Sequence, residues 1–175
     1  MKMSVGCGVI EVVQGDITKQ EVAAIVNAAK NSLLGGGGVD GAIHEAAGPE
    51  LLAECITIGN CDTGDAVTTD GYLLPAGKVI HTVGPVWYGG NEGERYLLES
   101  CYKCSLDEAI EHRLCTIAFP AISCGVYGYP IPEAARIAIL SVMDVLENNV
   151  GIDLVRFVMF DDETLIPFTE VLENL

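Results

Sequence analysis

Short apolar runs alternate along this chain with segments of helical periodicity, and no other feature restricts the possible folds as strongly. The apolar runs are typical of strands buried in a sheet, and they span residues 8–15, 23–29, 116–122 and 153–161. The helical segments show a 3.6-residue spacing or the end signals of helices, and they span residues 39–47, 50–59, 94–112, 132–148 and 163–175. This alternation predicts an α/β domain whose mostly parallel or mixed sheet carries helices on both faces.

The remaining segments complete this prediction. Residues 66–74 and 78–85 have the pattern of two strands on either side of the turn Pro75-Ala76-Gly77. The last helix contains Pro167, so we expect that helix to be kinked or to begin only at the proline. The 175 residues suit one domain and contain no internal repeat and no proline-rich linker. We therefore expect a single domain over residues 1–175.

The charge of the chain argues against several classes of partner. Nine lysine and arginine residues stand against 25 aspartate and glutamate residues, which gives a net charge of −16. Non-specific binding to DNA or RNA requires cations that neutralise phosphates, so we expect no DNA partner and no binding to an anionic membrane. If this protein binds a phosphate group, backbone N–H groups must supply most of the contacts.

Other features are typical of a soluble, cytoplasmic protein. No stretch of about 18 or more apolar residues is present, so we expect no membrane span. The first residues, MKMSVGCGVIEVV, lack the long apolar region and the cleavage site of a signal peptide. An odd number of scattered cysteines in a chain this large and apolar indicates reduced, mostly buried thiols, and they lie at positions 7, 55, 61, 101, 104, 115 and 124.

The spacing of cysteines and histidines does not predict a metal site. Cys101 and Cys104 fall within a predicted helix, where a separation of three residues only places them on one face. No second such pair is present, and the three histidines, at positions 44, 81 and 112, lie far apart in the sequence. We therefore predict that the protein works without a metal or another cofactor.

Two glycine-rich loops lie where α/β proteins bind ligands. The loop NAAKNSLLGGGGVD covers residues 27–40, and the loop SCGVYGYP covers residues 123–130. Each follows a buried strand and leads into a helix, so its glycines would let N–H groups approach phosphate oxygens at a helix N-terminus. Two such loops can hold the two halves of a diphosphate. The alternative is that the glycines only allow tight turns, but a tight turn needs one or two glycines, and Gly35–Gly38 supply four.

Neither loop matches the common nucleotide motifs. The run Gly36–Gly41 can be fitted to G-x-G-x-x-G, but no acidic residue stands at a strand end about 20 residues later. No Gly-Lys-Ser/Thr follows the glycines, so the loop is not a phosphate-binding loop of the Walker type.

Four side chains near these loops each allow two interpretations. Asp40 is either a first-turn acid, favoured by the helix dipole by about 0.3–1 kcal/mol, or a carboxylate that orients or deprotonates a water. His44, one turn later, is interpreted as a core or supporting histidine. Asp16 is either a helix N-cap or an acceptor for the exocyclic amine of a base. Phe160 either stacks on a base or belongs to the core.

Several motifs together resemble one known family. The segments VVQGDIT, AIVNAA, LLGGGGVDGAIHEAAG, CDTGDAV, VIHTVGPVW and IAFPAISCGVYGYP occur here in the order and spacing of a macrodomain, of the class that includes the MacroD-type ADP-ribosyl hydrolases. The resemblance extends from about Ile10 to Asp161. It implies a three-layer α/β/α sandwich around a six-stranded mixed sheet.

The resemblance also implies a cleft for ADP-ribose. Its ligand-binding residues would be Asp16, Ile17, Asn27, Gly36, Gly37, Gly38, Val39, Ser123, Cys124, Gly125, Val126, Tyr127 and Phe160. The implied partners are ADP-ribose, ADP-ribosylated proteins and O-acetyl-ADP-ribose.

The family assigns a part of the ligand to each of these positions. Asp16 would accept from the adenine amine, with a backbone contact from Ile17 and an aromatic contact from Phe160. Asn27 would contact the distal ribose, which the glycine run and Val39 would wrap together with a phosphate. The loop at 123–127 would cradle the diphosphate, and its Tyr127 would close over the distal ribose. The resemblance implicates Asp40 in catalysis.

The sequence departs from the family at one important position. MacroD-type members usually read N-A-A-N, whereas this chain has Lys30 at the second asparagine and Asn31 after it. Lysine cannot accept a hydrogen bond, so Lys30 would reach a phosphate or the distal ribose as a cation, or pair with Asp40 and lower its basicity. The alternative is a solvated Lys30, with Asn31 taking over the role. Cys124 replaces a common threonine, which leaves the backbone N–H groups available.

These observations favour an enzyme that hydrolyses ADP-ribose from proteins or deacetylates O-acetyl-ADP-ribose, with catalytic roles for Asp40 and Asn27 and an uncertain role for Lys30. Lys30 also supports a second hypothesis, a module that binds ADP-ribose with little or no chemistry. A nucleic-acid or poly(ADP-ribose) binder is a third hypothesis, which the net charge of −16 disfavours.

Overall fold

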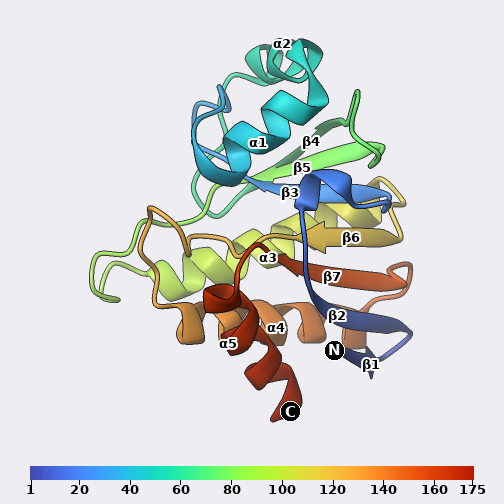
Figure 1. The fold of residues 1–175 in the computed structure, drawn as a ribbon, viewed down its shortest axis with the longest axis vertical. Coiled ribbons are helices and arrows are strands. Elements are labelled where there is room, and N and C mark those ends of the chain that lie inside the picture. Colours follow the sequence, from blue (N-terminus) through green and yellow to red (C-terminus); the bar gives the residue numbers. More distant parts are fainter.

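The computed structural model describes residues 1–175 as five helices and one seven-stranded sheet (Figure 1). The strands are β1 Lys2–Val5, β2 Gly8–Gln14, β3 Ala24–Ala28, β4 Ala66–Asp70, β5 Lys78–Thr82, β6 Thr116–Phe119 and β7 Leu154–Met159. The helices are α1 Gly38–Ala47, α2 Pro49–Ile58, α3 Glu94–Glu111, α4 Ile131–Asn148 and α5 Asp162–Glu173, with a 3₁₀ turn, η1, at Ile17–Lys19. None of these helices combines the length and apolar composition needed to cross a membrane.

The sheet is mixed, with the strand order β1-β2-β7-β6-β3-β5-β4. The five inner strands run parallel, and β1 and β4 pair antiparallel at the two edges. The expectation of six strands was therefore wrong by one, because the first residues of the chain form β1. Only Val5 of this edge strand is buried and the strand carries no apolar run, so periodicity did not reveal it. Its Lys2 pairs with Glu11 of β2, with 3.0 Å between Nζ and Oε1.

Helices cover both faces of the sheet, which confirms the predicted three-layer arrangement. Helices α1 and α2 lie at the top of Figure 1 and pack on one face, while α3, α4 and α5 pack on the other. Side chains of successive strand residues alternate between the two cores. In β3, Ala24 and Val26 belong to the larger core, whereas Ile25 belongs to the smaller core beneath α1 and α2. The same alternation places Asn27 on the α1 face.

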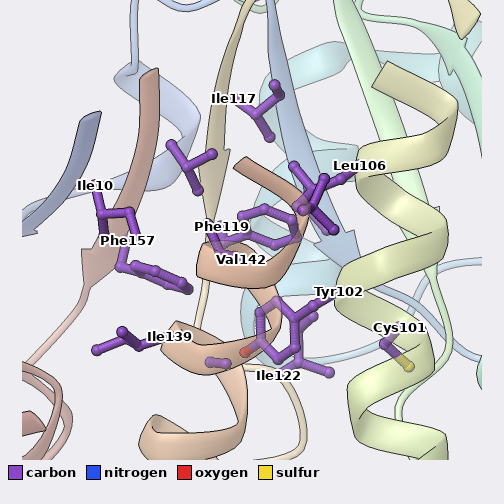
Figure 2. Close-up of a cluster of buried hydrophobic side chains, with 14 of the residues drawn as sticks. Ile10, Cys101, Tyr102, Leu106, Ile117, Phe119, Ile122, Ile139, Val142 and Phe157 are labelled. Atoms are coloured by element: carbon purple, nitrogen blue, oxygen red, sulfur yellow. The ribbon is translucent and has the colours of Figure 1, made fainter. Parts of the chain in front are cut away.

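The larger core is built around aromatic side chains (Figure 2). Phe119 lies 5.1 Å from Tyr102 and 5.9 Å from Phe157, measured between ring centroids. All three rings are fully buried. Such tilted and offset contacts contribute about 0.5–1.5 kcal/mol per pair beyond the burial of apolar area, and they hold β6 and β7 against α3.

Several predicted boundaries were wrong. Strand β4 ends at Asp70 rather than at residue 74, because the Gly71 N–H donates to the Gly77 carbonyl oxygen over 2.9 Å and closes the turn early, and β5 ends at Thr82 rather than at residue 85. Strand β6 ends at Phe119 rather than at residue 122, because Pro120 cannot donate to a sheet ladder. Helix α5 begins at Asp162 and contains Pro167. It starts there because the Asp161 carboxylate accepts the Thr164 N–H over 3.0 Å and caps the helix.

The topology brings the predicted site residues to one end of the sheet. The parallel strands β2, β7, β6 and β3 are consecutive neighbours, so their carboxyl ends lie side by side. Asp16 follows β2, Phe160 follows β7, the loop at 123–130 follows β6, and Asn27 lies near the end of β3. Open α/β sheets bind ligands at this end.

Candidate functional site

The glycine run forms the N-terminus of α1. Gly35 and Gly38 have φ values of 83° and 59°, which residues with a side chain rarely adopt. A Cβ atom added to Gly37 or Gly38 would have no neighbour within 4 Å, so the backbone there is open to an approaching molecule. The N–H groups of residues 35–40 donate no hydrogen bond within the chain. The run therefore offers several free donors at the positive end of a helix dipole.

The second loop is held in a strained conformation. Ser123 has a φ of 63°, which typically costs about 1–3 kcal/mol for a residue other than glycine. Its buried hydroxyl donates to the Pro85 carbonyl oxygen over 2.8 Å, and the Trp87 N–H donates to the Tyr127 carbonyl oxygen over 2.9 Å. These bonds hold the loop against residues 84–87. The N–H groups of residues 125–127 donate no hydrogen bond within the chain, so this loop also presents free donors.

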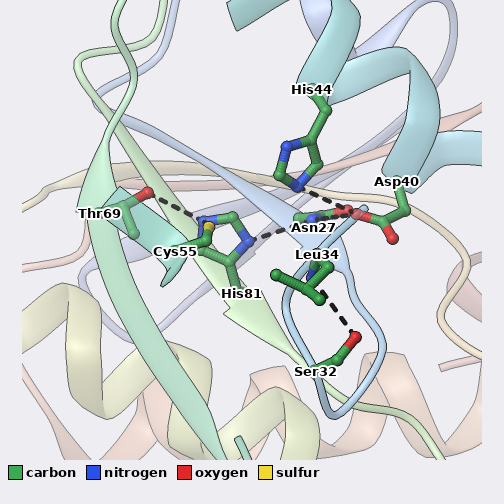
Figure 3. A network of polar contacts seen from close by, with 8 residues as sticks. All are labelled: Asn27, Ser32, Leu34, Asp40, His44, Cys55, Thr69 and His81. Carbon is green, nitrogen blue, oxygen red and sulfur yellow. Dashed lines mark hydrogen bonds and ion pairs between the residues drawn. The ribbon is translucent and has the colours of Figure 1, made fainter. Parts of the chain in front are cut away.

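A buried carboxylate and a buried amide meet beneath the glycine run (Figure 3). Asp40, in the first turn of α1, is only 4% exposed, and Asn27 of β3 is fully buried. The Asn27 Nδ2 donates to Asp40 Oδ1 over 2.9 Å. The other two oxygens, Asp40 Oδ2 and Asn27 Oδ1, are buried without a hydrogen-bond partner. A buried acceptor without a partner costs about 1–3 kcal/mol, so both oxygens favour a ligand that brings hydroxyl groups or a water.

His44 lies beside Asp40, one turn later in α1. Its Nε2 lies 3.5 Å from Asp40 Oδ1, and 13% of its side chain is exposed. The ring also lines a surface cavity of about 390 Å³ beside the glycine run, together with Leu34, Glu45 and Leu52. His44 therefore lies beside Asp40, in keeping with its interpretation as a supporting histidine.

Lys30 lies over the glycine run and forms no ion pair. A Cβ atom added to Gly36 would lie 2.8 Å from Lys30 Nζ and 3.4 Å from Asp40 Oδ2, so both atoms lie beside the Gly36 backbone. Of the alternatives for Lys30, an ion pair with Asp40 is not found, and the lysine extends over the glycine instead. Asn31 is engaged in another loop, where its Nδ2 donates to the Cys61 carbonyl oxygen over 2.9 Å.

Asp16 and Phe160 lie together at the other end of this row of loops. The Gly15 N–H donates to the Met159 carbonyl oxygen over 2.9 Å. This bond joins the two residues that come directly before Asp16 and Phe160. Asp16 is the N-cap of η1, since its Oδ1 accepts the Thr18 N–H over 2.9 Å. The Thr18 hydroxyl also donates to Asp16 Oδ1 over 2.6 Å, and these bonds from the hydroxyl and the N–H lower the Asp16 pKa. Phe160 is 85% exposed, so the core interpretation of this ring was wrong.

Four residues of the site carried no assignment from the sequence. His81 and Thr69 extend the hydrogen bonds of Asn27, and Gly84 and Pro85 brace the loop at Ser123. The motif VIHTVGPVW contains three of them, but spacing alone indicated no contact.

Burial raises the pKa of the Cys124 thiol to about 12, so this cysteine is not a reactive thiolate. No group of three or more His, Cys, Asp or Glu side chains is arranged to hold a metal ion.

This chain is similar to known proteins in both sequence and structure. The family model of the Macro domain matches residues 26–138. An O-acetyl-ADP-ribose deacetylase of Klebsiella pneumoniae is 54% identical over 168 residues, which are 94% of this chain and 96% of the relative. The Oceanobacillus iheyensis macrodomain with ADP is 44% identical, with a TM-score of 0.94 over 99% of this chain and 95% of that one. The Trypanosoma brucei macrodomain in complex with ADP-ribose is 41% identical, with a TM-score of 0.88 over 93% of this chain and 68% of that one. The chain therefore belongs to the macro domain family, as the motifs in its sequence predict.

Proposed function

We propose that this protein is an ADP-ribose-binding hydrolase, which deacetylates O-acetyl-ADP-ribose or releases ADP-ribose from modified proteins by attack of a water held beside the distal ribose. The observation that carries the proposal is the buried Asp40 carboxylate, with one oxygen held by Asn27 and the other without a partner. The names and ligands of its relatives support the same chemistry.

The order of the loops suits an extended dinucleotide-like ligand. Asp16 and Phe160 follow β2 and β7 and would take the adenine. The loop at 123–127 follows the next strand, β6, and would take the diphosphate. Asn27 and Asp40 come next and would take the distal ribose. Strands β2 and β3 are three intervals apart in the sheet, and at a spacing of ~4.8 Å between neighbouring strands this separation is about 14 Å.

Backbone donors account for diphosphate binding in an acidic protein. The free N–H groups at 35–40 and 125–127 face no competing hydrogen-bond partner within the chain. They carry fixed partial positive charges that require no lysine or arginine. A protein with a net charge of −16 can therefore bind a single diphosphate while it repels long polyanions.

The arrangement of Asp40 suits the activation of a water. A water that donates to Asp40 Oδ2 would be oriented toward the distal ribose, and the carboxylate would accept its proton during attack. In deacetylation, the water oxygen bonds to the acetyl carbon and the ester C–O bond breaks. Acetate leaves, and the ribose oxygen receives a proton. The bond from Asn27 keeps Asp40 Oδ1 in place, so little reorganisation precedes the reaction.

The second candidate function is an ADP-ribose reader with little or no turnover. The observation that favours it is Lys30, whose ammonium lies over Gly36 beside the reacting end of the proposed site. A cation there would hold a phosphate well and would also weaken Asp40 as a base.

Replacement of Lys30 by asparagine tests these two functions. For the hydrolase, we expect measurable wild-type turnover, and a kcat several-fold to about tenfold higher in Lys30→Asn, because an ammonium near Asp40 is removed. The measurements are acetate release from O-acetyl-ADP-ribose, ADP-ribose release from an aspartate- or glutamate-modified protein, and the thermal shift with ADP-ribose. Lys103→Asn removes the same charge far from the site, on α3, and serves as the control. Tight ADP-ribose binding without wild-type turnover, and activity only in Lys30→Asn, would establish the reader instead.

Phe160→Ala is expected to weaken ADP-ribose binding without loss of stability. Stacking of an aromatic ring on a base contributes about 1–3 kcal/mol, so the Kd from calorimetry should rise about 5- to 150-fold. The melting temperature without ligand should remain unchanged, because the ring is 85% exposed. Tyr96→Ala removes another exposed aromatic, on α3, and should leave the Kd unchanged. An unchanged Kd in Phe160→Ala would remove Phe160 from the adenine site.

A further inference from the structure

His81 lies behind the Asn27 amide, on the side away from Asp40 (Figure 3). Asn27 and His81 are direct neighbours on the parallel strands β3 and β5, and both side chains are fully buried. The Asn27 Nδ2 lies 3.1 Å from His81 Nδ1. On the far side of the ring, His81 Nε2 lies 2.9 Å from the Thr69 hydroxyl of β4.

The donors and acceptors in this chain of contacts fix the tautomer of His81. The Asn27 Nδ2 can only donate, so His81 Nδ1, which faces it, is the acceptor, and Nε2 carries the hydrogen. The Thr69 hydroxyl can accept from Nε2 and donate its own hydrogen to the Asp70 carbonyl oxygen, 3.1 Å away. The two hydrogens of Asn27 Nδ2 then have two acceptors, Asp40 Oδ1 and His81 Nδ1. Each group in the chain has a compatible partner.

The surroundings keep this ring neutral. Burial lowers the pKa of His81 to about 3, with a smaller contribution from the charge of His44. The groups around it are Asn27 on β3, Thr69 on β4, Cys55 on α2 and His44 on α1, whose ring centroid lies 6.3 Å away. None of these is a carboxylate that would stabilise an imidazolium. A protonated ring would also direct an N–H at the Asn27 amide hydrogens.

We propose that His81 is a positioning residue, which fixes the orientation of the Asn27 amide and, through that amide, the Asp40 carboxylate. With both hydrogens of Nδ2 engaged, the amide oxygen must face the other way, and this is the buried oxygen that has no partner in the protein. A rotated amide would place its oxygen against Asp40 Oδ1 and its hydrogens toward the ligand. His81 thus keeps an acceptor, rather than a donor, directed at the ligand. The effect that we expect of His81 on kcat rests on the proposed hydrolase function.

Three variants separate this role from simple packing. His81→Phe retains a ring but removes the acceptor, and His81→Asn retains an acceptor near the position of Nδ1. Thr69→Val leaves His81 in place but removes the partner of its Nε2 hydrogen. We expect His81→Phe to lower kcat about tenfold or more, with KM and the ADP-ribose Kd changed by less than about threefold. We expect His81→Asn to remain within about threefold of the wild-type kcat, and Thr69→Val to lie between the two.

These rates are compared per folded site, counted by ADP-ribose binding, so that a loss of folded protein is not mistaken for a loss of function. His112→Asn changes an exposed histidine at the end of α3 and is the matched control. Equal losses in His81→Phe and His81→Asn would contradict the proposal, because the acceptor would then be irrelevant. Wild-type kcat in His81→Phe would contradict it as well.

A spectroscopic readout tests the same proposal without turnover. Nitrogen-15 chemical shifts of the imidazole, assigned by their loss in His81→Asn, should show the Nε2–H tautomer between pH 5 and 8 without titration. A ring that titrates in this range, or that carries its hydrogen on Nδ1, would overturn the positioning role. This result is independent of catalysis. An inactive wild type with the expected tautomer would therefore refute the hydrolase function while leaving the amide orientation established.

Discussion

Asp40→Asn is expected to lower kcat about 10²- to 10⁴-fold while the ADP-ribose Kd changes by less than about threefold. Asparagine retains the shape of the side chain and its bond from Asn27, but it cannot accept the proton of an attacking water. Asp40→Ala is expected to abolish turnover as well, with binding retained. The measurements are acetate release at saturating O-acetyl-ADP-ribose and ADP-ribose binding by calorimetry. Both variants should remain folded, because removal of a buried charge also removes its desolvation cost.

Glu50→Gln provides the matched control for this substitution. Glu50 is an exposed acid in the first turn of α2, as Asp40 is in the first turn of α1. If Asp40 acts only through the helix dipole, both variants should lose about 0.3–1 kcal/mol of stability and neither should lose activity. Full activity in Asp40→Asn would thus show that the catalytic assignment is wrong.

Gly84→Ala is expected to weaken both the fold and the diphosphate loop. A Cβ atom at this position would collide with Ser123 Oγ and lie 2.7 Å from Ile122 Cγ2. Ser123 is buried and already strained, so the loop must move. We expect the free energy of unfolding to fall by about 1–3 kcal/mol and the ADP-ribose Kd to rise at least tenfold. Urea denaturation gives the first value, and calorimetry gives the second.

Gly77→Ala is the control, because it makes the same change at the opposite end of β5. A Cβ atom there would have one neighbour, the Ala23 carbonyl oxygen at 3.8 Å, so stability and affinity should remain near wild type. If Gly84→Ala lowers stability but leaves the Kd unchanged, the loop at Ser123 does not contribute to ADP-ribose binding as proposed.

Local patterns in the sequence predicted most of the elements. The buried strands β2, β3 and β7 are mostly apolar, and helix α1 begins within one residue of the predicted start because the glycine run ends there. Strand β1 was missed because its residues carry no such apolar run. An exposed edge strand gains its stability from pairing with β2, and that pairing leaves no periodic signal in its own residues.

The sequence by itself determined the α/β order and the two glycine loops, and it led to the prediction of backbone donors, since periodicity, glycine content and charge are local properties. Only the tertiary structure decided which side chains meet. Asp40 and Asn27 are 13 residues apart and Asn27 and His81 are 54 apart, and their hydrogen bonds exist because β3 lies between α1 and β5. The burial that sets their donors, acceptors and charges comes from those packed neighbours, and no local pattern in the sequence encodes it.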